Sequence, residues 1–485
     1  MSESLCLKHV VEALKGTPLA AAPELLATPL TDVVVDSRQA TPGSLFVALP
    51  GERVDGHDYV ADAYERGAVA ALVQRPVDVD VAIWDLAEHG ERLGAAARFG
   101  QLPITFLVPN TLAGLQQMAT YWRRRFALRV VGVTGSVGKS TSKELIWAVL
   151  QQRFNTLKNP GNLNNEIGLP LTLLKLTPAH ERVVLEMGMY DLGEIRQLCE
   201  IARPQVGVIT NVGPSHLERL KTVERIAQAK AELVEALPPD GAAILNVDDP
   251  AVRKMAEMVP PQVQVFTYGL TEDADLWADQ VVSEGLEGIR FVLHYAGEAL
   301  HVKVPLLGRH SVHTALRATA VGLVENMTWD DIMTGLLGSA VQLRLVSVVG
   351  INGSLLLDDT YNSSPTSTIA ALNLLEDLMG RKIAVLGDMA ELGAYEAEGH
   401  RKVGCRAADV ADMLIAVGPR SRTMAAEARA CGMPNDLVIE VDDNDQAIKI
   451  LRQLLGPDDI VLVKGSRSMA MEEIVVGLQV PVGRQ

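Results

Sequence analysis

A glycine-rich segment at residues 132–141 constrains the fold of this chain more than any other feature of its sequence. It reads Gly-Val-Thr-Gly-Ser-Val-Gly-Lys-Ser-Thr, and it lies between an apolar run at 129–134 and a predicted helix from Lys139 to about Gln151. Glycines at a strand-to-helix turn let backbone N–H groups point inward, and the helix N-terminus adds partial positive charge. The segment therefore predicts a nucleotide-phosphate loop in a parallel α/β sheet.

Two kinds of contact are expected from this loop. Lys139 would meet the β and γ phosphates of ATP, and the hydroxyls of Ser140 and Thr141 are candidate Mg²⁺ ligands. The spacing departs from the strict G-x-x-x-x-G-K-[ST] form because Val133 stands at the first glycine. The alternative is a glycine-rich turn that binds no ligand. A GTPase is disfavoured, because the Asn-Lys-x-Asp motif that recognises guanine is absent. The predicted ATP contacts of the loop are Thr134, Gly135, Ser136, Val137, Gly138, Lys139, Ser140 and Thr141.

The strand pattern around the loop indicates the domain organisation. Apolar strands at 182–186, 206–210 and 242–246 are separated by enough chain for crossover helices, which predicts a doubly wound parallel sheet. A second alternation of strands and helices begins near residue 341 and is typical of a Rossmann-like unit. We therefore expect an α/β chain of three domains: a small N-terminal domain at 1–107, a central ATP-binding domain at 108–340 and a C-terminal Rossmann-like domain at 341–485.

Charge and cysteine positions argue against several classes of protein. The chain has 44 Lys and Arg against 60 Asp and Glu, a net charge of −16, which disfavours nucleic-acid binding by broad phosphate neutralisation. Its cysteines, Cys6, Cys199, Cys405 and Cys431, show no CxxC and no paired spacing. We therefore expect neither a disulfide framework nor a zinc ribbon, and a reducing cytoplasm fits. No leader and no run of about 18 apolar residues is present, so membrane insertion is not expected.

Three further residues are candidates for the chemistry near the phosphates. Glu186 ends a predicted strand, His216 lies in a loop after the next strand, and Lys230 lies beside the apolar face of a predicted helix at 223–235. Carboxylates at strand ends are common Mg²⁺ ligands in doubly wound sheets. Taken singly, each has a plainer interpretation: a solvated acid, a surface histidine or a snorkelling lysine.

Together these segments resemble the Mur ligases, the ATP-dependent amide-bond formers of peptidoglycan precursor synthesis. The resemblance implies that CO₂ carbamylates Lys230. It also implies that the carbamate, Ser140, Glu186 and His216 are the ligands of two Mg²⁺ ions. The central motifs that carry the resemblance are the 134–141 loop, Asn159-Pro-Gly-Asn-Leu-Asn-Asn-Glu-Ile-Gly168, Glu186-Met-Gly188, the His216 loop and Ala227-Gln-Ala-Lys230.

Motifs outside the central domain are similar to those of the family members that add D-alanyl-D-alanine. The Asp-Asn-Pro-Arg motif usual in the members that add the third amino acid is absent, as is a Gly-Lys-Gly-His-Glu-like run. The expected substrates are UDP-N-acetylmuramoyl-tripeptide and D-alanyl-D-alanine, used by a monomeric chain. The motifs are Asp36-Ser-Arg38, Pro42-Gly-Ser-Leu-Phe46, Gly51-Glu-Arg-Val-Asp-Gly-His57, Asp358 to Ser367, Gly387 to Gly393 followed by His400, and Leu462 to Arg467.

The resemblance also implies a role for each remaining site residue. The implied catalytic residues are Lys139, Lys230, His216 and Asn362. The implied nucleotide or hinge contacts beyond the loop are His310, Arg344 and Asp359. The implied substrate contacts are Ser37, Arg38, Asp55, His57, Asn164 and Asn165 for the UDP-linked peptide, and Asp388, Lys464, Ser466 and Arg467 for the dipeptide.

Three departures from the family pattern leave the adenine and hinge contacts open. Ser311 and Thr314 stand where asparagines near the adenine are common, Leu343 replaces the glycine before Arg344, and Ser363-Ser364 replaces Ala-Asn in the Tyr-Asn-Ala-Asn-Pro motif. Ligation is expected to proceed through an acyl phosphate, because ATP must first activate the carboxylate. The alternatives are a ligase for the third amino acid, a folylpolyglutamate-type ligase, or a nucleotide-binding regulatory protein on the same fold.

Overall fold

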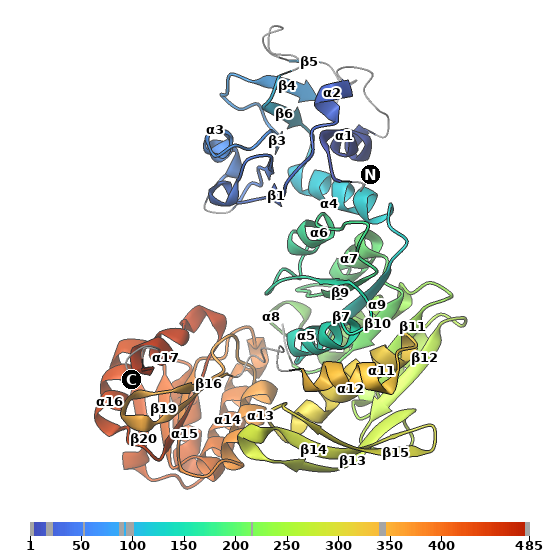
Figure 1. Cartoon of the computed structure of the whole chain (residues 1–485). Helices are drawn as coiled ribbons and strands as arrows, with labels where there is room; N and C mark the ends of the chain where they lie inside the picture. The colour runs from blue at the N-terminus through green and yellow to red at the C-terminus, as the bar shows by residue number, and fades with distance from the viewer. Residues whose placement is uncertain are drawn as a thin grey trace. The chain divides into compact units, whose positions relative to one another are not determined.

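The computed structural model describes residues 4–15, 23–51, 54–86, 92–93, 101–214, 217–338 and 346–480. Within these ranges the chain forms three β-sheets, each accompanied by helices, which confirms the α/β class (Figure 1). No helix in the described ranges is long and apolar enough to cross a membrane. The predicted site residues His216 and Arg344, and the hinge position Leu343, lie outside them.

The first sheet has six strands in the order β1-β2-β3-β6-β4-β5. All its pairings are parallel except that between β4 and β5. Strand β3 is buried along its whole length, as expected for a parallel strand covered on both faces. The strands are Val33–Val34 (β1), Leu45–Val47 (β2), Ala70–Val73 (β3), Ala82–Asp85 (β4), Arg92–Leu93 (β5) and Ile104–Leu107 (β6), and the helices are Leu7–Lys15 (α1), Pro23–Leu26 (α2) and Val60–Glu65 (α3).

The second sheet has nine strands in the order β15-β14-β13-β12-β11-β10-β7-β9-β8. The predicted strands at 182–186 and 242–246 are confirmed with the same bounds. The strand predicted at 206–210 ends one residue earlier, at Ile209. The strands are Arg129–Thr134 (β7), Thr156–Lys158 (β8), Arg182–Glu186 (β9), Val206–Ile209 (β10), Ala242–Asn246 (β11), Gln264–Gly269 (β12), Leu276–Ser283 (β13), Ile289–Tyr295 (β14) and Glu298–Val304 (β15).

The predicted doubly wound parallel sheet is extended at one end by antiparallel strands that were not predicted. Strands β13, β14 and β15 pair antiparallel, and they form the yellow-green hairpins of Figure 1. Burial alternates along β13 and along the end of β15, whereas the parallel strands β10 and β11 are buried throughout. This alternation is typical of an antiparallel extension with one solvated face.

Helices accompany the central strands, and α5 packs against both α11 and α12. The N-cap of α4 is Asn110, whose side chain accepts from the backbone N–H of Ala113 at 2.8 Å; the neighbouring Thr111 is the first helical residue. The helices are Thr111–Arg123 (α4), Lys139–Leu150 (α5), Gly168–Leu173 (α6), Glu194–Ala202 (α7), Leu217–Leu220 (α8), Val223–Glu235 (α9), Pro250–Lys254 (α10), Val312–Val324 (α11) and Trp329–Leu337 (α12).

The third sheet has six strands in the order β16-β17-β21-β18-β19-β20, parallel except at β16. Successive residues of β21 enter different cores: Leu462 packs on one face and Val461 and Val463 on the other. The elements are Val346–Val349 (β16), Leu355–Asp358 (β17), Pro365–Glu376 (α13), Arg381–Gly387 (β18), Glu396–Val410 (α14), Met413–Val417 (β19), Ser421–Ala430 (α15), Val438–Val441 (β20), Asn444–Leu454 (α16), Asp459–Lys464 (β21) and Glu472–Leu478 (α17).

A disulfide in this region corrects the expectation from cysteine spacing. Cys405 on α14 is bonded to Cys431, which directly follows α15, and their Cα atoms are 5.3 Å apart. The two helices approach closely because Gly404 has no side chain: a Cβ there would lie 2.3 Å from the carbonyl oxygen of Met424. Helix packing therefore pairs two cysteines that their spacing in the sequence does not relate.

Candidate functional site

The phosphate loop has the predicted strand, turn and helix, and its conformation requires glycine. Gly135 has φ +149° and Gly138 has φ +82°, both in the region that favours glycine. A Cβ on Gly135 would lie 1.8 Å from the Thr210 hydroxyl oxygen, so no other residue fits there without rearrangement. Strand β7 ends at Thr134 and helix α5 begins at Lys139, as expected.

Two residues at the end of β10 hold the loop in this shape. The side-chain amide of Asn211 donates to the Val137 carbonyl at 3.0 Å and accepts from the Val137 N–H at 2.9 Å. The Thr210 hydroxyl donates to the same carbonyl at 2.7 Å. Sequence reasoning missed both residues, although their position directly after a buried strand was the available signal.

The side chain of Lys139 folds back onto the phosphate loop. Its ammonium group donates to the carbonyl oxygens of Gly135 at 2.8 Å and Ser136 at 3.3 Å. Both carbonyls belong to the loop that is predicted to surround the phosphates. The positive charge of Lys139 therefore lies next to the predicted phosphate position. Ser140 follows it and is buried.

Lys230 is buried in the core face of α9 with only 2% of its surface exposed. Ile226, Ala229 and Leu233 lie on the same buried face, as the sequence predicts. Burial, and secondarily the charge of Lys139, lower the pKa of Lys230 well below its ordinary value. A neutral amine is the form that attacks CO₂, so the environment of Lys230 suits carbamylation.

Glu186 ends β9 and is oriented by two asparagines of the 159–168 segment. Its carboxylate accepts from the side-chain amide of Asn164 at 2.9 Å. Asn159 donates to the Glu186 carbonyl at 3.1 Å and accepts from its N–H at 2.9 Å. Asn165, in contrast, accepts from the Gly168 N–H at 2.9 Å at the start of α6. Of the two predicted substrate asparagines, Asn164 thus orients Glu186 and Asn165 supports a helix start.

The described residues include no group of three or more His, Cys, Asp or Glu side chains placed to hold a metal ion. The predicted metal set is of another kind, since it combines the Ser140 hydroxyl, one carboxylate and a lysine that becomes anionic only when carbamylated. Buried Glu186 and buried Lys230 fit such a set, because Mg²⁺ prefers oxygen ligands.

The predicted N-terminal substrate residues fall into two small networks. Asp36 pairs with exposed Arg38 at 2.7 Å, and Ser37 beside them is buried. The His57 ring is buried: its Nε2 accepts from the backbone of Gln74 at 3.0 Å, so its proton is on Nδ1 and is donated to Asp55. The backbone and ring N–H groups of His57 lower the pKa of Asp55 to about 2.

The C-terminal motifs meet around a second buried lysine. Lys464, at the end of β21, pairs with Asp359 at 2.7 Å and donates to the carbonyl of Asn362 at 2.8 Å. The resemblance implies a nucleotide or hinge contact for Asp359, a dipeptide contact for Lys464 and a catalytic role for Asn362. The structure places all three in one network.

The other predicted dipeptide residues surround this network in different ways. Asp388 accepts from the backbone N–H groups of Arg420 and Ser421, at 3.0 and 2.8 Å. Ser466 is buried and accepts from the Ala390 N–H at 2.8 Å. Arg467 is exposed and pairs with Glu472 at 2.7 Å.

The segment after Gly308 holds the residues that depart from the family pattern. His310 is exposed, Ser311 donates to the Leu307 carbonyl at 2.6 Å, and Thr314 accepts from Arg317 at 2.9 Å. Arg317 is buried, and no sequence motif marks it. After Thr210 and Asn211, it is the third residue near the loop that the motifs did not indicate.

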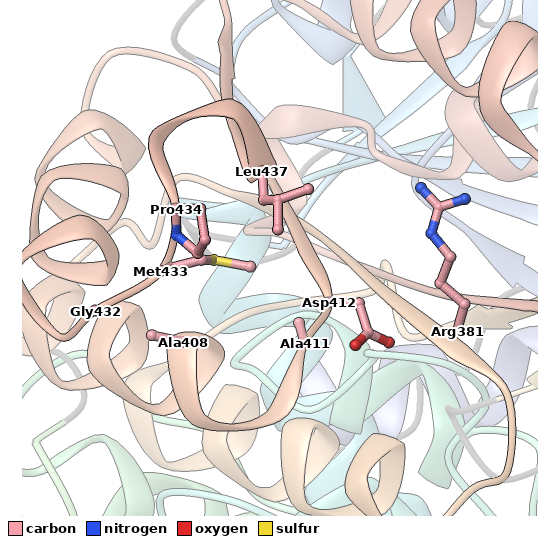
Figure 2. Close-up of a pocket in the computed structure, with 8 residues that line it drawn as sticks. All are labelled: Arg381, Ala408, Ala411, Asp412, Gly432, Met433, Pro434 and Leu437. Carbon is pink, nitrogen blue, oxygen red and sulfur yellow. The ribbon is translucent and has the colours of Figure 1, made fainter.

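A hollow in the C-terminal region lies apart from these residues (Figure 2). Its volume is about 510 Å³, and none of the predicted site residues lines it. Apart from Arg381 and Asp412 its lining is apolar or glycine. The lining residues are Arg381, Ala408, Ala411, Asp412, Gly432, Met433, Pro434 and Leu437.

Comparison with protein families gives three matches along the chain. Residues 29–104 match the Mur ligase family catalytic domain, residues 133–322 the Mur ligase middle domain, and residues 344–467 the Mur ligase glutamate ligase domain. The matches follow the order of the three sheets and support three domains.

Individual proteins match over almost the full length. The UDP-N-acetylmuramoyl-tripeptide--D-alanyl-D-alanine ligase of Bacillus subtilis (strain 168) is 35% identical, over 97% of this chain and 98% of the relative. The crystal structure of MurF from Acinetobacter baumannii is similar with a TM-score of 0.83 and 29% identity, over 98% of both chains. The MurF ligase of Thermotoga maritima in complex with ADP is similar with a TM-score of 0.76 and 30% identity, over 92% of this chain and 96% of that one.

Proposed function

The chain belongs to the Mur ligase family, and on this basis we propose that it joins D-alanyl-D-alanine to UDP-N-acetylmuramoyl-tripeptide with consumption of ATP. The observation that carries the proposal is full-length similarity to ligases of that name, including the C-terminal region. This places the protein among the ATP-dependent ligases of peptidoglycan synthesis rather than among regulatory proteins on the same fold.

The loop residues bind the nucleotide. Backbone N–H groups of the loop and the N-terminus of α5 face the phosphates, and Lys139 adds a charge at the same place. The structure of the Thermotoga maritima relative holds ADP, which supports nucleotide binding here. The γ phosphate passes to the terminal carboxylate of the tripeptide, and the dipeptide amine then attacks the acyl carbon and releases phosphate.

Mg²⁺ would be held by Ser140, Glu186, His216 and the carbamate of Lys230. When bound, it supplies positive charge that stabilises the phosphates during transfer. Asn164 holds the Glu186 carboxylate in place through its amide. The buried surroundings of Lys230 lower the pKa of its amine, which favours the neutral form that reacts with CO₂.

The C-terminal network serves the incoming dipeptide. Lys464 and Asp359 hold the backbone of Asn362, so that the Asn362 side chain is presented from a fixed position. Asp388 and Ser466 hold neighbouring turns. Exposed Arg467 has a charge available for the dipeptide carboxylate. We propose that the reaction takes place in the cytoplasm and that a single chain carries it out.

The direct test is an assay for ADP release with purified protein. ADP and phosphate should appear only when Mg²⁺, the UDP-linked tripeptide and D-alanyl-D-alanine are all present. UDP-peptides ending in lysine or in diaminopimelate should be compared, because the third residue is not assigned. Equal turnover without the dipeptide, or with a single amino acid in its place, would overturn the proposal.

A further inference from the structure

Arg317 is a buried cation beside the phosphate loop that the proposed function does not use. It lies on α11 and is 4% exposed. Its NH2 atom lies 3.4 Å from the position that a Cβ on Gly138 would occupy. Gly138 directly precedes helix α5, so the guanidinium reaches the start of the helix that receives the phosphates.

The hydrogen bonds of Arg317 leave part of its donor capacity unused. One terminal nitrogen donates to the Thr314 hydroxyl at 2.9 Å, and the other lies 3.4 Å from the hydroxyl of buried Tyr268 on β12. Within the described ranges its Nε has no hydrogen-bond partner, and Arg317 forms no ion pair there. Both partners are neutral hydroxyls, and neither compensates the charge.

The groups around Arg317 supply little negative charge. Two carboxylates, Asp248 and Asp249, act on the neighbouring Tyr268. Asp248 pairs with His313 at 2.8 Å, and Asp249 accepts from the Val212 N–H at 2.7 Å. Lys139, which directly follows Gly138, adds positive charge on the loop side. A buried and unpaired guanidinium is costly, so it is retained where an anion completes its surroundings.

We infer that Arg317 is a nucleotide-binding residue that donates to the phosphate oxygens of ATP and ADP, with Thr314 holding its guanidinium in place. This inference rests on the proposed function only in taking the nucleotide as the ligand. A planar cation with several N–H donors and no acceptor suits the oxygens of a phosphate.

The test is nucleotide affinity, measured by calorimetry without either peptide substrate. Arg317→Met should weaken ADP and ATP binding by about tenfold to a hundredfold, because a hydrogen bond to a charged group is lost. Adenosine, which has no phosphate, should bind with unchanged affinity. Arg317→Lys should recover part of the ADP affinity because it keeps the charge.

Arg309→Met is the matched control. Arg309 is exposed and lies just before α11. The substitution therefore removes the same charge as Arg317→Met without creating a cavity in a buried site. Its ADP affinity should stay within about twofold of the parent, since an exposed charge is screened. Thr314→Val should weaken ADP binding less than Arg317→Met does.

Two results would overturn the inference. One is ADP affinity in Arg317→Met equal to that of the parent protein. The other is an equal loss for adenosine and ADP, which would mean that Arg317 shapes the base pocket or only the fold. Failure of the dipeptide to support turnover would overturn the proposed reaction and leave these binding results intact.

Discussion

Lys230 and Lys464 are equally buried, each 2% exposed, and their surroundings are opposite. Lys464 has a carboxylate partner, Asp359, and a backbone carbonyl acceptor. Lys230 has the cation Lys139 nearby, and its pKa is lowered well below the ordinary value. Burial alone therefore does not define the role of a lysine. The charge placed beside it decides whether it serves as a fixed cation or as a reactive amine.

The largest expected effect comes from removing the reactive lysine. Lys230→Met should lower ligation by about a hundredfold or more, because the proposed carbamate ligand of Mg²⁺ is lost. The free energy of unfolding should not fall, since an apolar side chain replaces a buried amine without an acid partner. Turnover and urea unfolding measure the two quantities.

Two controls distinguish the loss of a positive charge from the loss of the proposed carbamate. Lys254→Met removes an exposed lysine on α10 and should leave turnover unchanged. A short carboxylic acid added to Lys230→Ala should restore part of the activity by taking the place of the carbamate. Full ligation by Lys230→Met would contradict the assigned role.

The second effect is on stability in the C-terminal region. Lys464→Met should lower the free energy of unfolding by about 3 kcal/mol, because it leaves the mostly buried carboxylate of Asp359, 14% exposed, without its partner. The double variant Lys464→Met with Asp359→Leu should be less destabilised than the two single variants combined. Strictly additive losses in urea unfolding would show that the pair is not coupled.

The smallest expected effect is on the pH dependence of stability, and it concerns a third buried basic side chain, His57. Its partner Asp55 has a pKa lowered from 3.8 to about 2, so the ionised carboxylate stabilises the folded state. This contribution is complete above pH 4 and is lost as the pH falls from about 4 to about 2. Because Asp55 is 34% exposed, it amounts to about 1 kcal/mol at most after screening.

Asp55→Asn is the variant that checks this pH dependence. Its free energy of unfolding should lie below that of the parent at pH 6, and the difference should shrink as the pH falls toward 2. The urea midpoint followed at both pH values measures the difference. A difference that grows on acidification would contradict the assigned sign.

Sequence reasoning found the local parts of the fold with good bounds. Helix 223–235 and the strands at 129–134, 182–186 and 242–246 agree with the structure, because period and turn residues are local signals. The antiparallel strands β13 to β15 were missed, since no loop motif marks them and they lie outside the repeated strand and helix pattern.

The sequence predicted individual residues of the candidate site but not the contacts between them. Lys139, Glu186 and Lys230 stood out by motif or resemblance. Thr210 and Asn211 offered only their position directly after a buried strand, and Arg317 carries no local signal. The disulfide between Cys405 and Cys431 was missed for the same reason. In each case the relevant partner lies far away in the sequence.

By itself, then, the sequence determined the α/β class, the phosphate loop, the acidic charge and the family. The tertiary structure decided the state of each buried basic group: Lys230 beside Lys139, Lys464 on Asp359, and Arg317 on two hydroxyls. The physical reason is the range of the interactions. Hydrophobic periodicity and turn preferences act over a few neighbours, whereas desolvation and Coulomb interactions depend on whichever residues the fold brings together.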